Sequence, residues 1–509
     1  YFWVQYAGGK MQVVAADGQD VQPVNVDKFL IATAETYDVI IHIPANNKYE
    51  LRATSQDISG YTSAFFGEGN LVPAPTIPKV DYFKIMQHMN GMMSSMNMTM
   101  GASKTPMTNV EVHNIDMHDS SMNNMKMDDM SMMNDSSMHN MNMQNNSGMD
   151  NMKMDGMNMG NMKMYGFDYP PDNGNDVVLS YDMLKAANND AAIPTPQGKP
   201  DRIINLTATG NMLRYVWSFN NTTLSDADKI LIKKGEHVRV IFHNNTMMEH
   251  PLHLHGHFFR LSNNSNSLDD EPLKHTFNLP PMQTDTIDFA ADEEKDWFFH
   301  CHTLYHMLSG MARVFHYDST LPDVQKQDPQ LYKNFTNDHG RHTFLWGASS
   351  FQSQGNFTNF TIAGTKWEVN EEFKWNYKNL YENETMFKRF LDNRQFLTGF
   401  VGVYNRREET GEIKNGKKLI RDENVATVGV TYLLPLFIMA EGRVDNTGHF
   451  RLKLMRNDLA LSRRARFSVA WNTDKEYMFG AKYVVAKNLA LTGSYDSDYG
   501  WGAGISLVY

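Results

Sequence analysis

Two short stretches of the chain decide how its fold is interpreted: residues 250–257 read HPLHLHGH, and residues 300–311 read HCHTLYHMLSGM. Successive side chains of a β-strand point to opposite faces, so His253 and His255 would share one face of a strand. By the same alternation, Cys301 would point away from the face that its two flanking histidines share. The two stretches therefore predict a pair of β-strands that carry metal-binding side chains.

The second stretch contains the one cysteine of the chain, so an internal disulfide is impossible and a chemical role for the thiol is favoured. A thiolate, two imidazoles and a weak thioether sulfur form the ligand set of a blue copper site. Cys301, His306 and Met311 provide three of these ligands. His250 provides the fourth, because Pro251 can redirect it out of the alternation of its strand. The flanking histidines would then bind other metal ions.

The remaining histidines of the β-rich regions lack this spacing. Isolated histidines in β-domains are usually core or surface residues. We interpret six of them in that way: His42, His237, His243, His257, His275 and His316.

Two further motifs are Ala16-Asp17-Gly18 and Trp217-Ser218-Phe219. Together with the two stretches, they make residues 1–318 resemble the copper-resistance branch of the multicopper oxidases. The resemblance implies that electrons pass from Cys301 to its two flanking histidines, which makes these three residues catalytic. It also implies these copper ligands: His250, Cys301, His306 and Met311 for type 1 copper, His253 for type 2 copper, and His255, His300 and His302 for the type 3 pair.

The family's trinuclear cluster of type 2 and type 3 copper also takes four histidines from two His-x-His motifs in its first domain. No such motif occurs outside the two stretches, and the chain begins at Tyr1 without a signal-peptide pattern. We therefore expect an amino-terminally truncated fragment. It would hold type 1 copper and only half of the trinuclear ligand set, and alone it would be inactive in oxygen reduction.

Length, charge and hydropathy restrict the number of domains and the classes of partner. At 509 residues the chain should fold as several domains. A formal net charge of −11, without basic runs, argues against nucleic-acid binding. No run of about 18 apolar residues occurs, which argues against a transmembrane helix.

Short β-rich runs divided by Gly, Pro and Asn/Asp turns predict an all-β chain with β-sandwiches. The resemblance implies that residues 1–85 form part of a second cupredoxin domain. Residues 177–318 form the carboxy-terminal cupredoxin-like domain, which carries the copper ligands. Residues 319–340 are polar and contain two prolines, as expected of a linker.

Residues 86–176 form a Met-rich low-complexity segment and linker. Of the 37 methionines of the chain, 25 lie within residues 86–164, where there is no aromatic residue. Such a composition predicts disorder in the absence of metal. A solvated tether and a segment that captures Cu(I) through soft thioether ligands both remain open. Four histidines are candidates for additional Cu(II) ligands: His88, His113, His118 and His139.

Residues 341–509 alternate in polarity over long strands, as in Phe450, Leu452 and Leu454 against Arg451 and Lys453. We count roughly ten strands of about ten residues, the length that a tilted transmembrane strand needs. This predicts a transmembrane β-barrel, and the region is loosely similar to the outer-membrane copper-resistance barrel family. A soluble β-domain is the alternative.

The resemblance implies a copper-resistance oxidase that converts Cu(I) to Cu(II) and reduces O2 to water, with phenols as further candidate donors. It would face the periplasm of a Gram-negative bacterium, be anchored in the outer membrane, and receive copper from periplasmic carriers. Two alternatives are a copper-sequestering protein and an outer-membrane barrel for copper efflux, with the oxidase part secondary.

Overall fold

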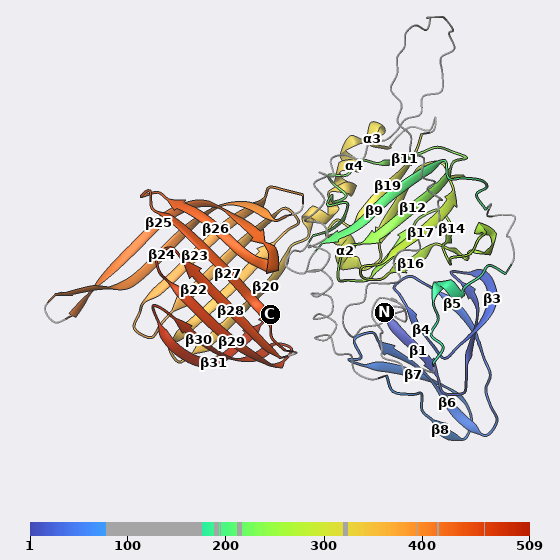
Figure 1. Cartoon of the computed structure of the whole chain (residues 1–509), viewed down its shortest axis with the longest axis horizontal. Helices are drawn as coiled ribbons and strands as arrows, with labels where there is room; N and C mark the ends of the chain where they lie inside the picture. Colours follow the sequence, from blue (N-terminus) through green and yellow to red (C-terminus); the bar gives the residue numbers. More distant parts are fainter. Residues whose placement is uncertain are drawn as a thin grey trace, which may run out of the picture. The chain divides into compact units, whose positions relative to one another are not determined.

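The structure is a computed structural model that describes residues 1–77, 176–187, 193, 195–210, 216–318, 324–393, 395–414, 417–462 and 464–509 (Figure 1). The predicted disorder and copper capture of residues 86–164, including the four candidate histidines there, concern residues outside these ranges. Within the described residues, strands dominate, and the expectation of an all-β chain is confirmed.

The amino-terminal part consists of two sheets that enclose a small core. Its strands are β1 (Phe2–Tyr6), β2 (Met11–Ala16), β3 (Gln19–Val26), β4 (Lys28–Ile31), β5 (Tyr37–Ile41), β6 (Asn47–Ser55), β7 (Tyr61–Gly67) and β8 (Asn70–Val72). One sheet has the order β4-β1-β6-β7, with β8 also paired to β6, and the other has the order β3-β2-β5. Met11 and Val13 alternate with more exposed residues along β2 and are fully buried in this core.

The second β-domain is a sandwich of a six-stranded and a five-stranded sheet. Its elements are β9 (Arg202–Gly210), β10 (Trp217–Phe219), β11 (Ile230–Ile232), β12 (His237–Asn244), β13 (His250–Leu254), β14 (Phe259–Leu261), β15 (Leu273–Lys274), β16 (Thr276–Leu279), β17 (Thr284–Ala290), β18 (Asp296–Cys301), helix α2 (Leu304–Leu308) and β19 (Ala312–Tyr317). The sheets have the orders β10-β9-β12-β17-β14-β15 and β11-β19-β18-β13-β16.

One continuous core lies between these two sheets. Phe242 and Phe289 reach it from the six-stranded sheet, and Leu252, Phe299 and Cys301 reach it from the five-stranded sheet. All five side chains are almost or completely inaccessible to solvent. The beginnings of both sequence stretches, in β13 and β18, therefore lie in one sheet with one face against a dry core.

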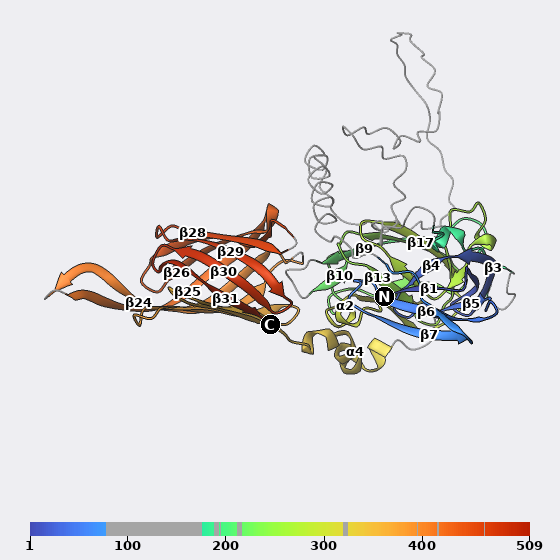
Figure 2. The ribbon, with the colours of Figure 1, turned by 90° about the horizontal axis from the view of Figure 1, so that it is seen from below.

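Residues 344–508 form a closed barrel in which every strand pairs with its neighbours in chain order, and β20 pairs with β31 (Figure 1). The strands are β20 (Phe344–Gln352), β21 (Gly355–Ala363), β22 (Trp367–Trp375), β23 (Tyr381–Phe390), β24 (Leu397–Lys414), β25 (Lys417–Leu434), β26 (Ile438–Asp445), β27 (Phe450–Ala460), β28 (Ala465–Asn472), β29 (Tyr477–Ala486), β30 (Leu489–Asp496) and β31 (Gly500–Val508). Figure 2 shows the long β24–β25 hairpin extending beyond its neighbours.

The expected barrel is confirmed, but its predicted count of roughly ten strands is wrong, because the barrel closes with strands β20 to β31, twelve in all. Only two residues separate β20 from β21, and only two separate β29 from β30. These turns, Ser353-Gln354 and Lys487-Asn488, lack the Asn-Gly or Asp-Gly pair that marks a two-residue hairpin in a sequence.

The barrel places apolar side chains outside and polar side chains inside. Along β24, Val401 and Val403 are exposed, at 57% and 49%, whereas Tyr404 is buried and faces inward. Arg406 points inward, like Tyr404. Arg407 points outward, like Val403, and pairs with Asp422 of β25. The alternation is typical of a barrel whose outer surface meets an apolar phase.

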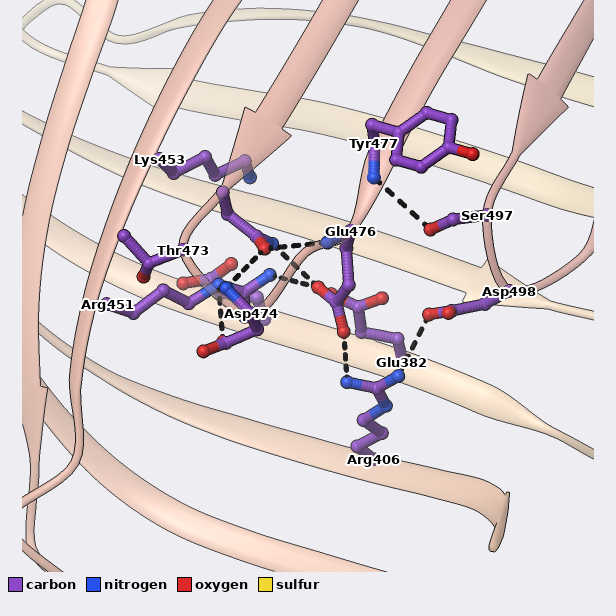
Figure 3. Close-up of polar contacts among 12 residues, drawn as sticks. Glu382, Arg406, Arg451, Lys453, Thr473, Asp474, Glu476, Tyr477, Ser497 and Asp498 are labelled. Carbon is purple, nitrogen blue, oxygen red and sulfur yellow. Dashed lines mark hydrogen bonds and ion pairs between the residues drawn. The ribbon is translucent and has the colours of Figure 1, made fainter. Parts of the chain in front are cut away.

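Ion pairs cross the barrel interior (Figure 3). Arg406 of β24 donates hydrogen bonds to Glu476, which precedes β29, and to Asp498, which precedes β31, the latter at 2.9 Å. Arg451 of β27 donates to the second carboxylate oxygen of Glu476 at 2.7 Å. Strands β24 and β29 are not neighbours, so these pairs span the interior rather than following the wall.

Two short helices occupy the region predicted to be a linker: α3 (Val324–Gln327) and α4 (Pro329–Thr336). Helix α4 begins with Pro329, and the side chain of Asp328 caps it by accepting a hydrogen bond from the Leu331 amide at 2.9 Å. Among the helices of the described ranges, none has the length and apolar character needed to cross a membrane.

Candidate metal centre

The pairing of β13 with its neighbours determines which side chains share a face. His253 lies opposite His300 of β18, and Leu252 lies opposite Cys301, in an antiparallel register without a shift. On the other side, β13 pairs with β16 from His250 to His253, also without a bulge. His253 and His300 therefore share one face of the sheet, whereas Cys301 lies on the other, as the alternation predicted.

The expectation that Pro251 redirects His250 is wrong. His250 and Cys301 lie on the same face by plain alternation, because His250 and Leu252 are two residues apart in a regular strand. No departure of the backbone from the strand is required.

The first cluster consists of three buried donor atoms that face one another. The Nδ1 atoms of His250 and His306 are 3.1 Å apart, and the Cys301 Sγ lies 3.7 Å from the first and 3.6 Å from the second. A point in the plane of these atoms lies about 2.0 Å from each, close to the metal–nitrogen bond length of about 2.0–2.1 Å and somewhat short of the metal–thiolate length of about 2.3 Å. The three donors thus fit a single metal ion in trigonal geometry.

Met311, the fourth predicted ligand, is fully buried in the same core. Its amide donates a hydrogen bond to the His306 carbonyl at 3.0 Å, and its carbonyl accepts one from the Cys301 amide at 3.1 Å. The backbone of Met311 is therefore tied to two of the three clustered residues.

Two neighbours orient the imidazoles. The Thr246 Oγ1 lies 2.7 Å from Nε2 of His250, which leaves Nδ1 directed at the cluster. The Trp217 ring stacks on His306 with the ring centroids 4.1 Å apart. The sequence motif around Trp217 therefore supports the site, whereas nothing in the sequence indicated Thr246.

Burial controls the protonation of this cluster. It raises the pKa of the Cys301 thiol to about 12 and lowers the pKa of His306 to about 3. The pKa of His250 lies well below its ordinary value, because of burial and then the neighbouring His306. Near neutral pH both imidazoles have free lone pairs, and a metal cation would replace the thiol proton.

The second cluster lies on the opposite face of the sheet and contains the other four predicted histidines. The Nε2 atoms of His255 and His300 are 3.1 Å apart. The His253 ring centroid lies 4.7 Å from that of His255 and 5.7 Å from those of His300 and His302. Four imidazoles thus converge, two from β13 and β18 and two from the residues that follow these strands. The ring of His275, from outside the two stretches, lies beside them, with its centroid 5.2 Å from that of His253.

Backbone carbonyls determine which nitrogen each ring presents. Nδ1 of His253 lies 2.8 Å from the His275 carbonyl, and Nδ1 of His300 lies 3.0 Å from the Cys301 carbonyl. Each Nδ1–H donates to its carbonyl, so Nε2 has the free lone pair. Burial lowers the pKa of both rings to about 4. The Nδ1 of His302 is buried and has no hydrogen-bond partner within the described part of the chain.

The six histidines interpreted as structural have other environments. His42 is exposed, and His275 contacts Thr276 beside the second cluster. The other four contact these partners: His237 with Asp288 at 2.5 Å, His243 with Thr284 at 2.9 Å, His257 with Tyr317 at 2.7 Å, and His316 with Asp296 at 2.5 Å.

Family models described as multicopper oxidase match residues 1–70 and residues 197–320, the regions of the two sandwiches. Residues 1–70 and 197–320 are therefore similar to multicopper oxidase domains, and this similarity implies copper as a cofactor.

The chain is also similar, over part of its length, to three known proteins. Copper resistance protein A of Escherichia coli is 37% identical over 328 residues, which cover 62% of this chain and 53% of that protein. Copper resistance protein A of Pseudomonas syringae pv. tomato is 41% identical over 336 residues, again 62% of this chain and 53% of that protein. A crystal structure of Fet3p, described as a multicopper oxidase that functions in iron import, aligns with 66% of this chain and 56% of its own, at 16% identity and a TM-score of 0.36. The chain spans about half the length of the curated relatives it matches.

Proposed function

We propose that this protein is a copper-resistance oxidase that converts Cu(I) to Cu(II) with O2 as the electron acceptor. Four Cu(I) ions would give up one electron each, and O2 with four protons would become two water molecules. The observation that carries this proposal is the placement of two ligand clusters on opposite faces of one sheet, joined through the consecutive residues His300 and Cys301. Similarity to the copper resistance proteins supports Cu(I) as the donor, and phenols are a second candidate class.

In this proposal the first cluster is a type 1 copper site, whose donor set suits one-electron transfer. Cys301 would supply the thiolate, His250 and His306 the imidazoles, and Met311 the axial thioether. The surrounding core excludes water from these atoms, because the three clustered residues are almost completely buried. A dry, rigid environment limits reorganisation during electron transfer.

The second cluster would contribute to a trinuclear site. His253 is assigned to type 2 copper, and His255, His300 and His302 to the type 3 pair. When copper is bound, such a site supplies the four-electron reduction of oxygen. The carbonyl contacts of His253 and His300 hold their rings with Nε2 free, so each is prepared to act as a ligand before metal binds.

Replacement of the thiol tests the proposal. The chain loaded with copper should show intense blue absorption, and Cys301→Ser should abolish it together with oxidase turnover of the full-length protein. His243→Ala is the matched control, because His243 lies exposed on β12 and its ring is hydrogen-bonded to Thr284, away from both clusters. If the wild-type chain binds copper without blue absorption, the type 1 assignment fails.

For the barrel, we propose an anchor in the outer membrane of a Gram-negative bacterium that holds the oxidase domains in the periplasm, where copper carriers could deliver Cu(I). The apolar outer surface supports insertion. The ion pairs across the interior favour an anchor over an open copper channel. Heat-modifiable migration in detergent and flotation with liposomes test insertion, and their absence would indicate a soluble β-domain.

A further inference from the structure

Asp17 occupies the tight turn that joins β2 to β3 in the amino-terminal sandwich. Both Asp17 and Gly18 have positive φ values, 50° and 74°, as in the turns preferred by two-residue hairpins. A turn residue of this kind is usually exposed, but the carboxylate of Asp17 has no solvent exposure. The turn therefore inserts the side chain into the protein rather than into water.

The carboxylate of Asp17 makes contacts in both sandwiches. Its Oδ1 accepts a hydrogen bond from the Thr36 amide of its own domain at 3.0 Å. Its Oδ2 accepts hydrogen bonds from the amides of His275 and Thr276, both at 3.1 Å, and lies 3.2 Å from the Lys274 ammonium. One side chain thus fixes the backbone where β15 passes into β16.

The same two residues hold His253 of the second cluster. Nδ1 of His253 lies 2.8 Å from the His275 carbonyl and 3.0 Å from the Thr276 hydroxyl. His253 also lies opposite Thr276 in the pairing of β13 with β16. The chain of contacts therefore runs from Asp17 through two consecutive backbone amides to the ring of a candidate copper ligand.

We infer that Asp17 is a positioning residue for His253. By fixing His275 and Thr276, it keeps the proton of His253 on Nδ1 and leaves Nε2 free, on the face where His255 and His300 converge. This inference rests on the proposed function for the copper role of His253, but the hydrogen-bond geometry itself does not depend on metal. Groups that orient a ligating histidine typically change metal affinity by about 10- to 100-fold when they are removed.

The negative charge of Asp17 also pairs with the buried ammonium of Lys274. Lys274 is completely buried and lies 3.2 Å from Asp17 and 3.3 Å from Glu35. Glu35 shares this ammonium, and its other hydrogen bonds join it to the Ala32 amide and to the hydroxyls of Tyr181 and Tyr37. Glu35 therefore matches Asp17 in burial and ion pairing but makes no hydrogen bond to the residues that hold His253.

This difference provides the experiment. In the metal-free chain, imidazole ¹⁵N chemical shifts, assigned with His253→Gln, report which nitrogen of His253 carries the proton. In Asp17→Ala both carboxylate oxygens are lost, so the amides of His275 and Thr276 have no side-chain acceptor. We expect His253 to lose the exclusive Nδ1–H form in Asp17→Ala and to keep it in the matched variant Glu35→Ala. An unchanged tautomer in Asp17→Ala, or the same change in both variants, would overturn the inference.

Loss of Asp17 also leaves Lys274 with one fewer buried partner, which can prevent folding. The double variant Asp17→Ala with Lys274→Met removes this charge while still lacking the acceptor for the two amides. Thermal melting and the blue absorption of the first cluster check that the fold is intact. In the folded double variant, a retained Nδ1–H form of His253 would again contradict the positioning role.

Copper titration followed by electron paramagnetic resonance adds a second readout. Copper bound outside the blue site should bind about tenfold more weakly in Asp17→Ala than in the wild type, with the blue site unchanged. If the wild-type chain binds no copper at the second cluster, the copper assignment of His253 fails. The tautomer measurement still decides whether Asp17 positions the ring, so the two failures are distinguishable.

Discussion

His300 and Cys301 are consecutive residues of β18, yet their side chains belong to different ligand clusters. The Cys301 Sγ faces His250 and His306 in the dry core, and Nε2 of His300 faces His255 on the other side of the sheet. Adjacent Cα atoms are about 3.8 Å apart, so the covalent path between the clusters is as short as a chain allows. The hydrogen bond from Nδ1 of His300 to the Cys301 carbonyl adds a second connection.

Because the sheet separates the clusters, substitutions on its two faces should have separable effects. His250→Gln should abolish the blue absorption and leave copper binding at the second cluster in place. His253→Gln should leave the blue absorption in place and abolish copper binding at the second cluster, since the side chain of His253 lies on the other face. Optical absorption and electron paramagnetic resonance of each copper-titrated variant distinguish the two results, and loss of both signals in either variant would contradict separate sites.

The protonated thiol predicts the pH dependence of copper binding at the first cluster. With the pKa of Cys301 at about 12 and that of His306 at about 3, binding near neutral pH displaces about one proton, all of it from the thiol. Affinity should therefore rise about tenfold per pH unit between roughly pH 5 and pH 9. Titration calorimetry in buffers of different ionisation enthalpy measures the proton released. Release of no proton at pH 7 would show that the thiolate exists before metal binds.

The ion pairs inside the barrel predict a closed interior. In planar bilayers the wild-type barrel should conduct little, and Arg406→Ser should raise the conductance several-fold, since it removes the side chain that bridges Glu476 and Asp498. Arg407→Ser is the matched control, because Arg407 points outward and pairs with Asp422. Equal conductance in both variants, or a large conductance in the wild type, would favour a channel.

The Met-rich segment predicts a difference between substrates. Deletion of residues 86–164 should weaken oxidation of Cu(I) at limiting copper more than oxidation of an organic electron donor, because thioethers bind Cu(I) selectively. Steady-state rates of the full-length protein with the two donors measure this ratio. An equal loss with both donors would indicate a tether without a role in delivery.

Local sequence rules predicted much of the candidate site. Alternation alone assigned Cys301 and its flanking histidines to opposite faces, and the same rule would have assigned His250 correctly without a role for Pro251. Alternation also predicted the barrel, although not its strand count.

Contacts between distant segments were beyond such rules. Asp17 contacts Thr276 across 259 positions of the chain, and neither residue has a spacing that reveals the contact. Thr246 is closer to its partner His250 in sequence, but a threonine four residues before a histidine has no distinctive meaning without the loop geometry that joins them. These supporting residues depend on how the chain folds back on itself.

The even number of strands in the barrel has a topological consequence. An antiparallel barrel with twelve strands returns the chain to the rim at which it entered, so Phe344 at the start of β20 and Val508 at the end of β31 lie at the same rim. If the barrel inserts in a bilayer, the copper-binding domains and residue Tyr509 must lie in the same compartment. A small epitope placed after Tyr509 would then report the compartment of the oxidase without any alteration of its domains.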